Sequence, residues 1–393
     1  MRRIRAGIVG LGSIGTIHLE TIRRLGWADV AAVCVRGRGR GRGHEGALRD
    51  LYGVPSVYDD YRDLVADPAV DVVHVCTPND SHFEIAAAAL AAGKHVLSEK
   101  PLARNADEAA RLASLADEAE ISSGAKAAVN FPYRHHAMAQ VARRMIEEGA
   151  LGDLHSVRGA YLQDWLLSGD ADNWRLDPAK AGKSRAMADI GSHWLDLARF
   201  LTGRDVLEVC ADVGEYVRRP RRSGTEDGGS VLLGFSGGLR GSFSVSQASA
   251  GRKMSFWIEI DGSEASLRWD HENPYRLWIG HGGKANEELI YHPSMAPAVA
   301  WEAVGQGLSP QEAQGEEPRG RLAQAWPRGK PERWPDPQKR MIEAFYRSIL
   351  DPPAKEEAAY GCATFKDGAR TALVVDAILE SHEGRRWVAV PPL

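Results

Sequence analysis

The sequence lacks the features that mark membrane-spanning, metal-clustered and nucleic-acid-binding proteins. No stretch of its 393 residues approaches the roughly 18 uninterrupted apolar residues that a membrane-spanning helix needs, which excludes a membrane span. A formal net charge of −4 provides no general attraction to nucleic acid or to an anionic membrane surface. The four cysteines are scattered, without CxxC or zinc spacing, so we expect a reducing cytoplasm and cysteines that fill buried space.

A long apolar segment near the start is also missing. The charged residues Arg2 and Arg3 precede an apolar run of only a few residues, which leads straight into a glycine motif. We therefore predict a first β-strand at Ile4–Val9 and no signal peptide. With 44% hydrophobic and 26% charged residues, the composition is that of a globular protein, and the length predicts two domains.

The first 130 residues alternate short apolar runs with amphipathic stretches, which is the pattern of a parallel sheet wrapped by helices. The predicted strands are Ile4–Val9, Val30–Val35, Val70–Cys76, His95–Ser98 and Ala125–Val129. The predicted helices are Gly15–Leu25, Gly46–Tyr52, Phe83–Ala92 and Asp107–Glu120. We expect an α/β domain over residues 1–130, in which His74 is a core histidine of an apolar strand.

The pattern changes after Val129, where long β-rich runs replace the alternation of strand and helix. These runs are Leu154–Gln163, Val206–Tyr216, Ser230–Phe235, Leu239–Gln247, Ser255–Asp261, Ala265–Trp269 and Tyr275–Ile279. Helices are predicted near Met138–Glu148, Gln338–Leu350 and Cys362–Ser381. We expect an α+β domain over residues 131–393, built on a large and mostly antiparallel sheet.

Two stretches are irregular. Residues 36–43 alternate strictly between Arg and Gly, and such a run cannot form a packed element. Residues 292–337 hold eight of the 20 prolines, which predicts a long surface excursion. This excursion is either an arm or a mobile insertion. As an arm, it would cover a neighbouring subunit or the active site.

The motif Gly10-Leu11-Gly12-Ser13-Ile14-Gly15 follows the first predicted strand and opens a helix, which is the context that dinucleotide binding requires. Gly10 permits a tight turn, Gly12 lets the backbone approach a pyrophosphate, and Gly15 lets helix and strand pack closely. The helix N-terminus at Ser13 and Ile14 supplies N–H donors for the phosphates. We predict a dinucleotide site here.

The acid that selects NAD in such sites is missing. About 20 residues beyond the glycines, an Asp or Glu would accept hydrogen bonds from the adenosine ribose. Val35 and Arg36 stand there instead, and the nearest downstream acid is Glu45. Guanidinium groups of Arg36 and Arg38 could pair with a 2′-phosphate, which favours NADP slightly. If this basic loop points into water, it does not discriminate between the cofactors, and NAD remains an equally open alternative.

Two motifs close neighbouring strands of the predicted parallel sheet. Thr77-Pro78-Asn79 ends one strand, with His82 shortly after, and Glu99-Lys100-Pro101 ends the next. Ligands bind at this end of such sheets, so Lys100 is expected to point into the same crevice.

A third motif opens an apolar helix in the second half of the chain. Asp189, His193 and Asp196 are spaced to share one helix face. Two carboxylates that flank an imidazole can fix its tautomer and raise its basicity, as a general base for an alcohol requires. Although Asp and His can bind metals, Lys100 nearby would repel a cation, so we predict no metal.

With these motifs the chain resembles the Gfo/Idh/MocA family of nicotinamide-dependent oxidoreductases. The resemblance covers most of the chain and rests on the glycine fingerprint with His18, the TPN segment, EKP and DxGxHxxD. It implies a Rossmann domain joined to an α+β domain whose open sheet forms walls of the substrate site and contacts in a homodimer or homotetramer. It implies acid–base work by Lys100 and His193, with Asp189 orienting the substrate. The implied nucleotide contacts are Thr77, Pro78, Asn79, His82, Glu99 and Lys100.

Within the family, Tyr161–Trp165 and Trp174-Arg175-Leu176 look like the branch of levoglucosan and related sugar dehydrogenases. By that analogy Gln163, Trp165 and Arg175 line the sugar pocket, and Tyr133 and Arg134 suit recognition of its hydroxyls. The two tryptophans are equally consistent with core aromatics.

The expected activity is oxidation of a secondary hydroxyl of a sugar, anhydrosugar or cyclitol, or the reverse reduction of the ketone, by hydride transfer to or from nicotinamide C4. Two alternatives share the same fold. One is a glycoside hydrolase or lyase that keeps and recycles a tightly bound nucleotide. The other is a non-catalytic nucleotide-binding sensor, which the presence of both Lys100 and His193 disfavours.

Overall fold

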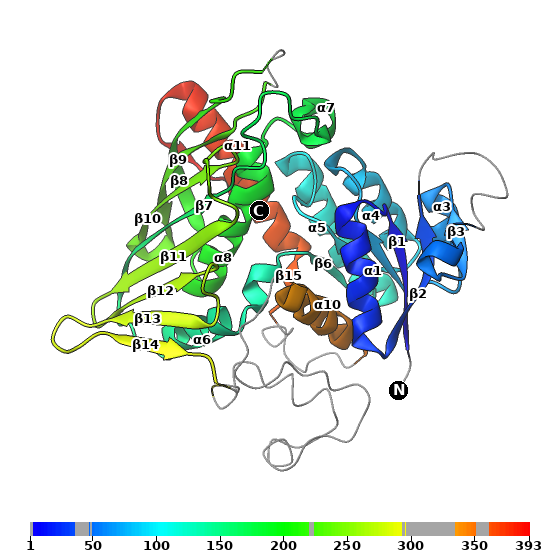
Figure 1. The fold of residues 1–393 in the computed structure, drawn as a ribbon, viewed down its shortest axis with the longest axis horizontal. Coiled ribbons are helices and arrows are strands. Elements are labelled where there is room, and N and C mark those ends of the chain that lie inside the picture. Colours follow the sequence, from blue (N-terminus) through cyan, green and yellow to red (C-terminus); the bar gives the residue numbers. More distant parts are fainter. Residues whose placement is uncertain are drawn as a thin grey trace, which may run out of the picture.

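The computed structural model describes residues 3–35, 47, 49–219, 224–292, 295, 335–350 and 361–393. The Arg-Gly run at 36–43, including Arg36 and Arg38, lies outside these residues, as does most of the proline-rich stretch. Two sheets stand on opposite sides of the molecule with helices between them (Figure 1).

The first sheet has seven strands in the order β15-β6-β5-β4-β1-β2-β3. All neighbours in it are parallel except β15, which runs antiparallel to β6. The strands are β1 (Ile4–Val9), β2 (Ala28–Cys34), β3 (Ser56–Tyr58), β4 (Val72–Val75), β5 (His95–Ser98), β6 (Ala127–Val129) and β15 (Ala363–Thr364). The order reverses between β1 and β4, and in parallel sheets such a reversal opens a ligand crevice at the carboxyl ends of the strands.

Helices cover both faces of this sheet, so its central strands are buried throughout, as in β4. They are α1 (Ser13–Leu25), α3 (Tyr61–Ala66), α4 (His82–Ala91), α5 (Ala106–Ser123) and α10 (Pro335–Leu350). The last of these comes from the C-terminal part of the chain and packs beside α1, where its Met341 and Phe345 join the core around β1.

The second sheet has nine strands in the order β14-β13-β12-β11-β7-β10-β9-β8-β16, and only the pair β7–β10 is parallel. The strands are β7 (Leu154–Leu162), β8 (Val206–Gly214), β9 (Gly228–Phe235), β10 (Arg240–Ser246), β11 (Ser255–Gly262), β12 (Ser266–Asp270), β13 (Arg276–Gly280), β14 (Glu287–Ile290) and β16 (Val388–Ala389). Buried and more exposed residues alternate along β8, which indicates that one face of the sheet is covered.

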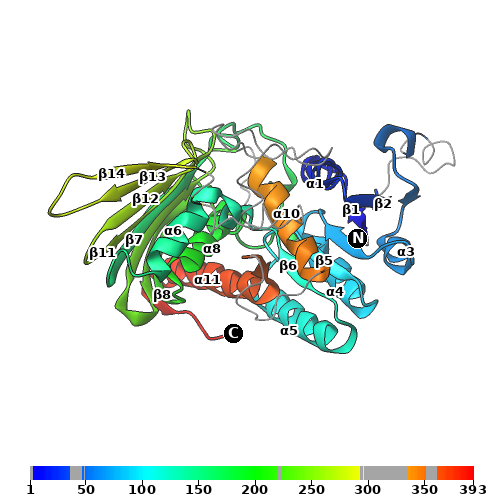
Figure 2. The same cartoon turned by 90° about the horizontal axis from the view of Figure 1, so that it is seen from below.

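Helices on that inner face lie between the two sheets (Figure 2). They are α6 (Ala137–Glu147), α8 (Ser192–Thr202) and α11 (Phe365–Gly384), with the short α7 (Pro178–Ala181) nearby. Every residue of α8 is buried. Because α11 packs against α5 on one side and β8 on the other, it links the layers of the two sheets.

The α/β and α+β architecture and the large, mostly antiparallel sheet are confirmed. Each predicted strand is present, with ends shifted by at most two residues, whereas β3, β14, β15 and β16 were not predicted. The division after residue 130 stays a prediction, and the structure adds that α10 and β15 complete the first sheet and its helix layer. Within the predicted excursion, Pro335 already begins α10.

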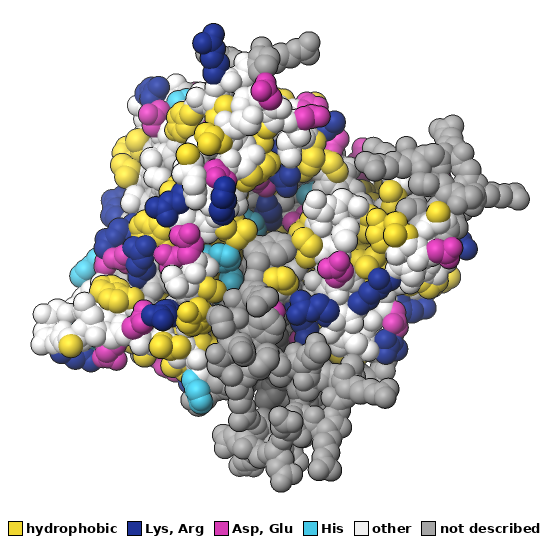
Figure 3. Space-filling view, viewed as in Figure 1, with side chains coloured by type: hydrophobic (Ala, Val, Ile, Leu, Met, Phe, Trp, Pro, Cys, Tyr) yellow, Lys and Arg dark blue, Asp and Glu magenta, His cyan; other side chains and the backbone are white. Residues whose placement is uncertain are grey.

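None of the helices in the described part of the chain is long and apolar enough to cross a membrane. On the face in Figure 3, basic and acidic side chains are interspersed rather than gathered into one basic patch.

Candidate active site

A cavity of about 1260 Å³ lies between the two halves of the molecule. The turn after β1 and the ends of β4, β5 and β6 line one side of it, and β7 and the segment before α8 line the other. This volume exceeds the roughly 300–1,000 Å³ of ordinary small-molecule pockets, so it offers room for a dinucleotide and a substrate together.

The glycine turn has the geometry that a dinucleotide site needs. Gly10 has φ +94°, and a Cβ there would lie 2.7 Å from the Cys76 carbonyl oxygen. At Gly15 a Cβ would lie 1.9 Å from the Gly10 carbonyl oxygen, so helix α1 can pack against the turn only without a side chain. At Gly12, by contrast, a Cβ would meet no protein atom within 4 Å. The space that Gly12 leaves open belongs to the cavity.

The N-terminus of α1 fits a pyrophosphate. Gly12 is the N-cap residue and provides no side-chain cap, and the first turn holds no acid. Ser13 and Ile14 line the cavity. The N–H groups of this first helical turn have no partner within the helix, and together with the positive end of the helix dipole they can bind an anion there. The residues present fit a dinucleotide.

Thr77, Pro78 and Asn79 line the cavity after β4, whereas His82 does not. Asn79 also donates a hydrogen bond from Nδ2 to the carbonyl of Ala181, 2.9 Å away, which ties the strand end to α7. His82 is buried, with its ring nitrogens 2.9 Å from the Pro101 carbonyl and 2.8 Å from the Thr77 carbonyl. The structure therefore places His82 behind the cavity, where it joins the two loops.

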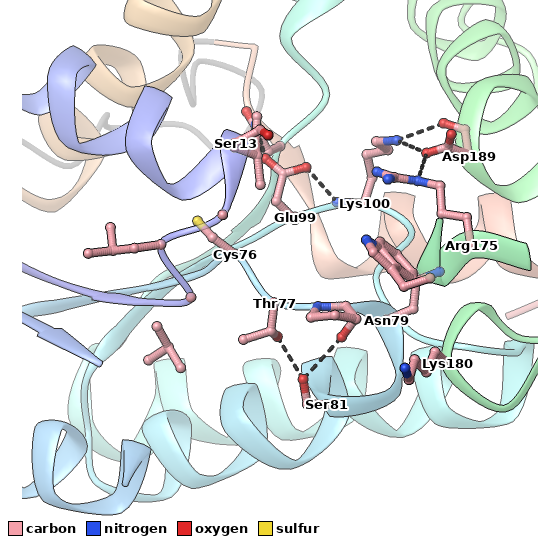
Figure 4. Close-up of a pocket in the computed structure, with 18 of the residues that line it drawn as sticks. Ser13, Cys76, Thr77, Asn79, Ser81, Glu99, Lys100, Arg175, Lys180 and Asp189 are labelled. Atoms are coloured by element: carbon pink, nitrogen blue, oxygen red, sulfur yellow. Dashed lines mark hydrogen bonds and ion pairs between the residues drawn. The ribbon is translucent and has the colours of Figure 1, made fainter. Parts of the chain in front are cut away.

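Lys100 enters the cavity from the end of β5 and forms an ion pair with Asp189 (Figure 4). Its Nζ donates to Asp189 Oδ1 at 2.8 Å and to the Asp189 backbone carbonyl at 2.7 Å. The side chains are only 12% and 13% exposed. This pair joins the first sheet to the segment that precedes α8.

Asp189 lies in a π-helical turn, Met187–Gly191, directly before α8. Such turns are rare and occur often at functional sites. Arg175 Nε lies 3.2 Å from Asp189 Oδ1, and Gln247 donates to Oδ2 at 2.8 Å. Burial alone would raise the pKa of Asp189, but the charges of Lys100 and Arg175 outweigh it and hold the pKa below the usual value. The carboxylate is therefore ionised and held by three side chains.

His193 lines the cavity next to Tyr133, with ring centroids 4.9 Å apart. Burial and the nearby charge of Lys100 lower the pKa of His193 to about 3, although Asp189 acts in the opposite direction. Its Nδ1 is enclosed and has no hydrogen-bond partner among the described residues. Asp189 raises the pKa as predicted, but burial and Lys100 outweigh it, so the imidazole is neutral at neutral pH, which is the form that accepts a proton.

Asp196, the second carboxylate of the predicted motif, binds another side chain and not His193. Its carboxylate receives hydrogen bonds from Arg134 Nη2 at 2.5 Å and from Nε at 2.8 Å, and both side chains are buried. Arg134 also lies 3.5 Å from Asp367 of α11. The expectation that Arg134 binds substrate is therefore not met. Its guanidinium forms ion pairs with these two acids, and the residue does not line the cavity.

The other predicted substrate residues do line the cavity, and several are joined by hydrogen bonds. Trp165 Nε1 donates to Gln163 Oε1 at 2.7 Å, and Gln163 Nε2 donates to the Tyr161 hydroxyl at 3.1 Å. The Tyr161 and Tyr133 hydroxyls lie 2.7 Å apart. Trp165 is 39% exposed, so it is a wall residue rather than a core aromatic.

Sequence reasoning missed several polar residues of the site, of which three hold other side chains of the site or come from distant elements. Asn130 directly follows β6, and the rule that ligands bind at strand ends could have identified it. Gln247 follows β10 and binds Asp189, but no motif marks it. Gln338 comes from α10, and no local signal connects it with residues so far away in the sequence. Among the described residues, no group of three or more His, Cys, Asp or Glu is arranged to hold a metal.

Comparisons with known proteins agree with this geometry. Residues 4–124 match the model of the oxidoreductase family with an NAD-binding Rossmann fold, and residues 139–268 match the GFO/IDH/MocA C-terminal domain. The chain is 31% identical to levoglucosan dehydrogenase of Pseudarthrobacter phenanthrenivorans, over 100% of both chains. It is 30% identical to myo-inositol 2-dehydrogenase of Thermotoga maritima, over 61% of this chain and 67% of that protein.

Solved structures show the same similarity. An oxidoreductase domain protein from Kribbella flavida has a TM-score of 0.83 at 30% identity, and both chains are fully covered. A levoglucosan dehydrogenase in complex with NADH and L-sorbose has a TM-score of 0.81 at 27% identity, again over both full chains. An inositol dehydrogenase homolog from Azotobacter vinelandii, complexed with NAD+, has a TM-score of 0.80 at 25% identity and covers 99% of this chain and 97% of its own.

Replacing Gly12 with Val should abolish dinucleotide binding and leave the fold intact. The side chain would occupy the open space beside the turn, where a pyrophosphate would lie, without meeting protein atoms. We expect affinity for NADH to fall roughly 100-fold or more, about 2.8 kcal/mol, in a fluorescence titration, with an unchanged Tm. Gly282→Val, at a glycine whose surroundings are equally open, is the matched control. Unchanged affinity in Gly12→Val would remove the dinucleotide site from this turn.

Proposed function

Since the chain belongs to the Gfo/Idh/MocA family of oxidoreductases, we propose that it is an NAD-dependent dehydrogenase of a sugar, anhydrosugar or cyclitol. It oxidises a secondary hydroxyl to the ketone or reduces the ketone in the reverse direction. The observation that carries the proposal is one cavity that holds Lys100, Asp189 and His193 and also extends to the glycine turn. An alcohol bound beside these three residues would be next to a nucleotide bound at the turn.

The nucleotide, when bound, supplies nicotinamide C4 as the hydride acceptor. Neutral His193 accepts the hydroxyl proton on its Nε2, the ring nitrogen that is not enclosed, as the carbinol carbon loses hydride. The Lys100 ammonium stabilises the developing negative charge on the substrate oxygen. Asp189 holds Lys100 in place through both its carboxylate and its backbone carbonyl. In the reverse reaction, His193 returns this proton from its Nε2 to the substrate oxygen, while the Lys100 ammonium stabilises the developing alkoxide.

The walls of the cavity suit a polyhydroxylated ring. Gln163, Arg175 and the paired Tyr133 and Tyr161 present hydrogen-bonding groups, and Trp165 adds a partly exposed indole to the wall. A site with several placed polar groups discriminates strongly against substrates that lack the matching hydroxyls. This lining and the similarity to levoglucosan and inositol dehydrogenases support the proposed substrate class.

A panel of monosaccharides, anhydrosugars and inositols, assayed for NADH formation, tests the proposal. Net accumulation of NADH with at least one of them is the expected result. A glycoside hydrolase or lyase that recycles its nucleotide would cleave a glycoside with no net change in NADH. A nucleotide-binding sensor would turn over none of these compounds.

We expect Lys100 and His193 to act in the chemical step. Lys100→Met or His193→Ala should lower kcat by about 10²–10⁴-fold, while the NADH affinity stays within about three-fold. The double variant should lose much less than the product of the single losses, because both residues act on one oxygen. Lys284→Met and His155→Ala, at exposed positions far from the cavity, are matched controls. A His193→Ala enzyme with near-wild-type kcat would show that the imidazole is structural.

The low pKa of His193 also fixes the shape of the pH–rate profile. A base is active in its unprotonated form, and a pKa of about 3 keeps His193 unprotonated as the pH falls from neutrality until it approaches that value. We therefore expect kcat for oxidation to show no acidic limb from His193 between about pH 5 and pH 8. His193→Ala should lower the whole profile without changing its shape. Loss of an acidic limb in His193→Ala would contradict the neutral-imidazole assignment.

NAD is the proposed nucleotide because solved relatives contain NADH or NAD+. The alternative, NADP, rests on Arg36 and Arg38. If they grip a 2′-phosphate, changing both to Ser should weaken NADP binding by about 10-fold, about 1.4 kcal/mol, and leave NAD binding unchanged. Arg240→Ser, at an exposed position on the second sheet, is the control. No change in NADP affinity would support NAD and a basic loop that does not contact the nucleotide.

The oligomeric state and the cytoplasmic location stay predictions. The outer face of the second sheet exposes Leu207 and Leu232, each 51% exposed, which supports its use as a contact between copies of the chain.

A further inference from the structure

A cluster of buried polar side chains lies next to Lys100, and the proposed chemistry uses none of them. It brings together α1, β4, two strand ends and α10. Its members are His18, His74, Glu99, Asn130, Gln338 and Tyr346. Buried polar groups destabilise a fold unless they are hydrogen-bonded, so a cluster of six requires an explanation.

Four of these side chains form a continuous chain of hydrogen bonds. The Tyr346 hydroxyl lies 2.7 Å from Nε2 of His74. His74 Nδ1 lies 2.8 Å from His18 Nδ1, and His18 Nε2 lies 3.0 Å from Glu99 Oε1. Glu99 lines the cavity, so the chain of hydrogen bonds runs from helix α10 to the cavity wall. Tyr346 is fully buried, so the chain does not lead to solvent and is no exit for protons.

One arrangement of hydrogens satisfies every donor in this chain. Burial would raise the pKa of Glu99, but His18 outweighs it and the pKa is about 2, so the carboxylate only accepts and His18 Nε2 carries a hydrogen. Burial lowers the pKa of His74 well below the usual value, so it is neutral. With its hydrogen on Nδ1, His74 donates to His18 and accepts the hydroxyl of Tyr346. The opposite tautomer would leave that hydroxyl without an acceptor among the described residues.

The two oxygens of Glu99 are used differently. Oε1 accepts from His18 and, at 2.5 Å, from Asn130 Nδ2. Asn130 is itself fixed by a reciprocal amide pair with Gln338, with both bonds at 3.1 Å. Among the described residues, Oε2 accepts a single hydrogen bond, from the backbone N–H of Lys100 at 3.3 Å. It can therefore accept a further donor from the cavity.

Glu99 lies between Ser13 at the glycine turn and Lys100 at the site of chemistry (Figure 4). The part of a dinucleotide that joins a pyrophosphate at the turn to a nicotinamide near Lys100 is a ribose, and its two hydroxyls are donors. A carboxylate with one free oxygen at this point matches those donors.

We propose that Tyr346, His74 and His18 are positioning residues that fix Glu99 as an ionised acceptor for the ribose hydroxyls beside the nicotinamide. Tyr346 of helix α10 thereby contributes to nucleotide binding although it does not itself line the cavity. The inference rests on the proposed function only in requiring that a dinucleotide binds in the cavity.

The tautomers provide a direct test. In ¹⁵N-histidine NMR spectra of the wild-type protein, assigned with His18→Asn and His74→Asn, we expect a neutral His74 protonated on Nδ1. His18 should carry its hydrogen on Nε2. Tyr346→Phe should shift the signals of both rings, because it removes the donor at the end of the chain. A His74 protonated on Nε2, or signals that do not respond to Tyr346→Phe, would overturn the chain.

A double-mutant cycle tests whether the chain acts through Glu99. Tyr346→Phe should weaken NADH binding by about 3–10-fold in fluorescence titrations, and the same change should have no further effect in a Glu99→Gln background. Tyr58→Phe, which removes a hydroxyl bonded to Asp67 far from the chain, is the matched control and should leave affinity unchanged. Because only KM for NAD should rise in Tyr346→Phe while kcat is retained, steady-state kinetics provide a second readout.

The outcomes separate this inference from the proposed function. Suppose that the wild-type protein binds NADH and that Tyr346→Phe has equal effects in both backgrounds, or no effect in either. This result overturns the inference and leaves the proposed function intact. A wild-type protein that binds neither NADH nor NADPH overturns both.

Discussion

The ion pair between Lys100 and Asp189 is the interaction on which the rest of the site depends. It connects the end of β5 in the first sheet to the π-helical turn before α8. Both charges are nearly enclosed, and removing one partner of such a pair leaves an uncompensated buried charge, at a cost of about 3–5 kcal/mol. Arg175 and Gln247 hold the same carboxylate, so its position is over-determined. The cavity between the two halves thus has a fixed polar centre.

The same charges set the protonation of the neighbouring groups. Burial and the charge of Lys100 keep His193 neutral. Asp196 binds Arg134 and not the imidazole. The Lys100 cation and the neutral His193 base therefore both line the cavity. In the proposed reaction, Lys100 stabilises negative charge and His193 transfers the proton. On the other side of Lys100, Glu99 stays ionised because His18 donates to it. The two acids next to Lys100 in space thus play different parts: Asp189 orients the lysine, and Glu99 faces the proposed nucleotide.

Most of the fold could be predicted from the sequence because its signals are local. The apolar runs of β1 and β5 agree with the structure residue for residue, and Gly10, Gly12 and Gly15 mark the turn without knowledge of any partner. Two-residue strands such as β15 and β16 were missed because they pair only where tertiary contacts bring them to a sheet edge. The addition of α10 to the first sheet was missed for the same reason, since its apolar face does not identify the surface that it covers.

The sequence by itself determined the chemistry that is present: a turn that admits a pyrophosphate, a lysine at a strand end, and an Asp–His motif at the start of a helix. Each of these depends on spacing within a few residues. Only the tertiary structure decided the pairing of charges, because a carboxylate binds the cation that folding brings near it. The spacing of Asp189, His193 and Asp196 therefore suggested one cluster, whereas Lys100 and Arg134, about 60 to 90 residues away, separated it. Tyr346 reaches Glu99 through two histidines for the same physical reason: burial forces polar groups to find partners wherever the fold supplies them.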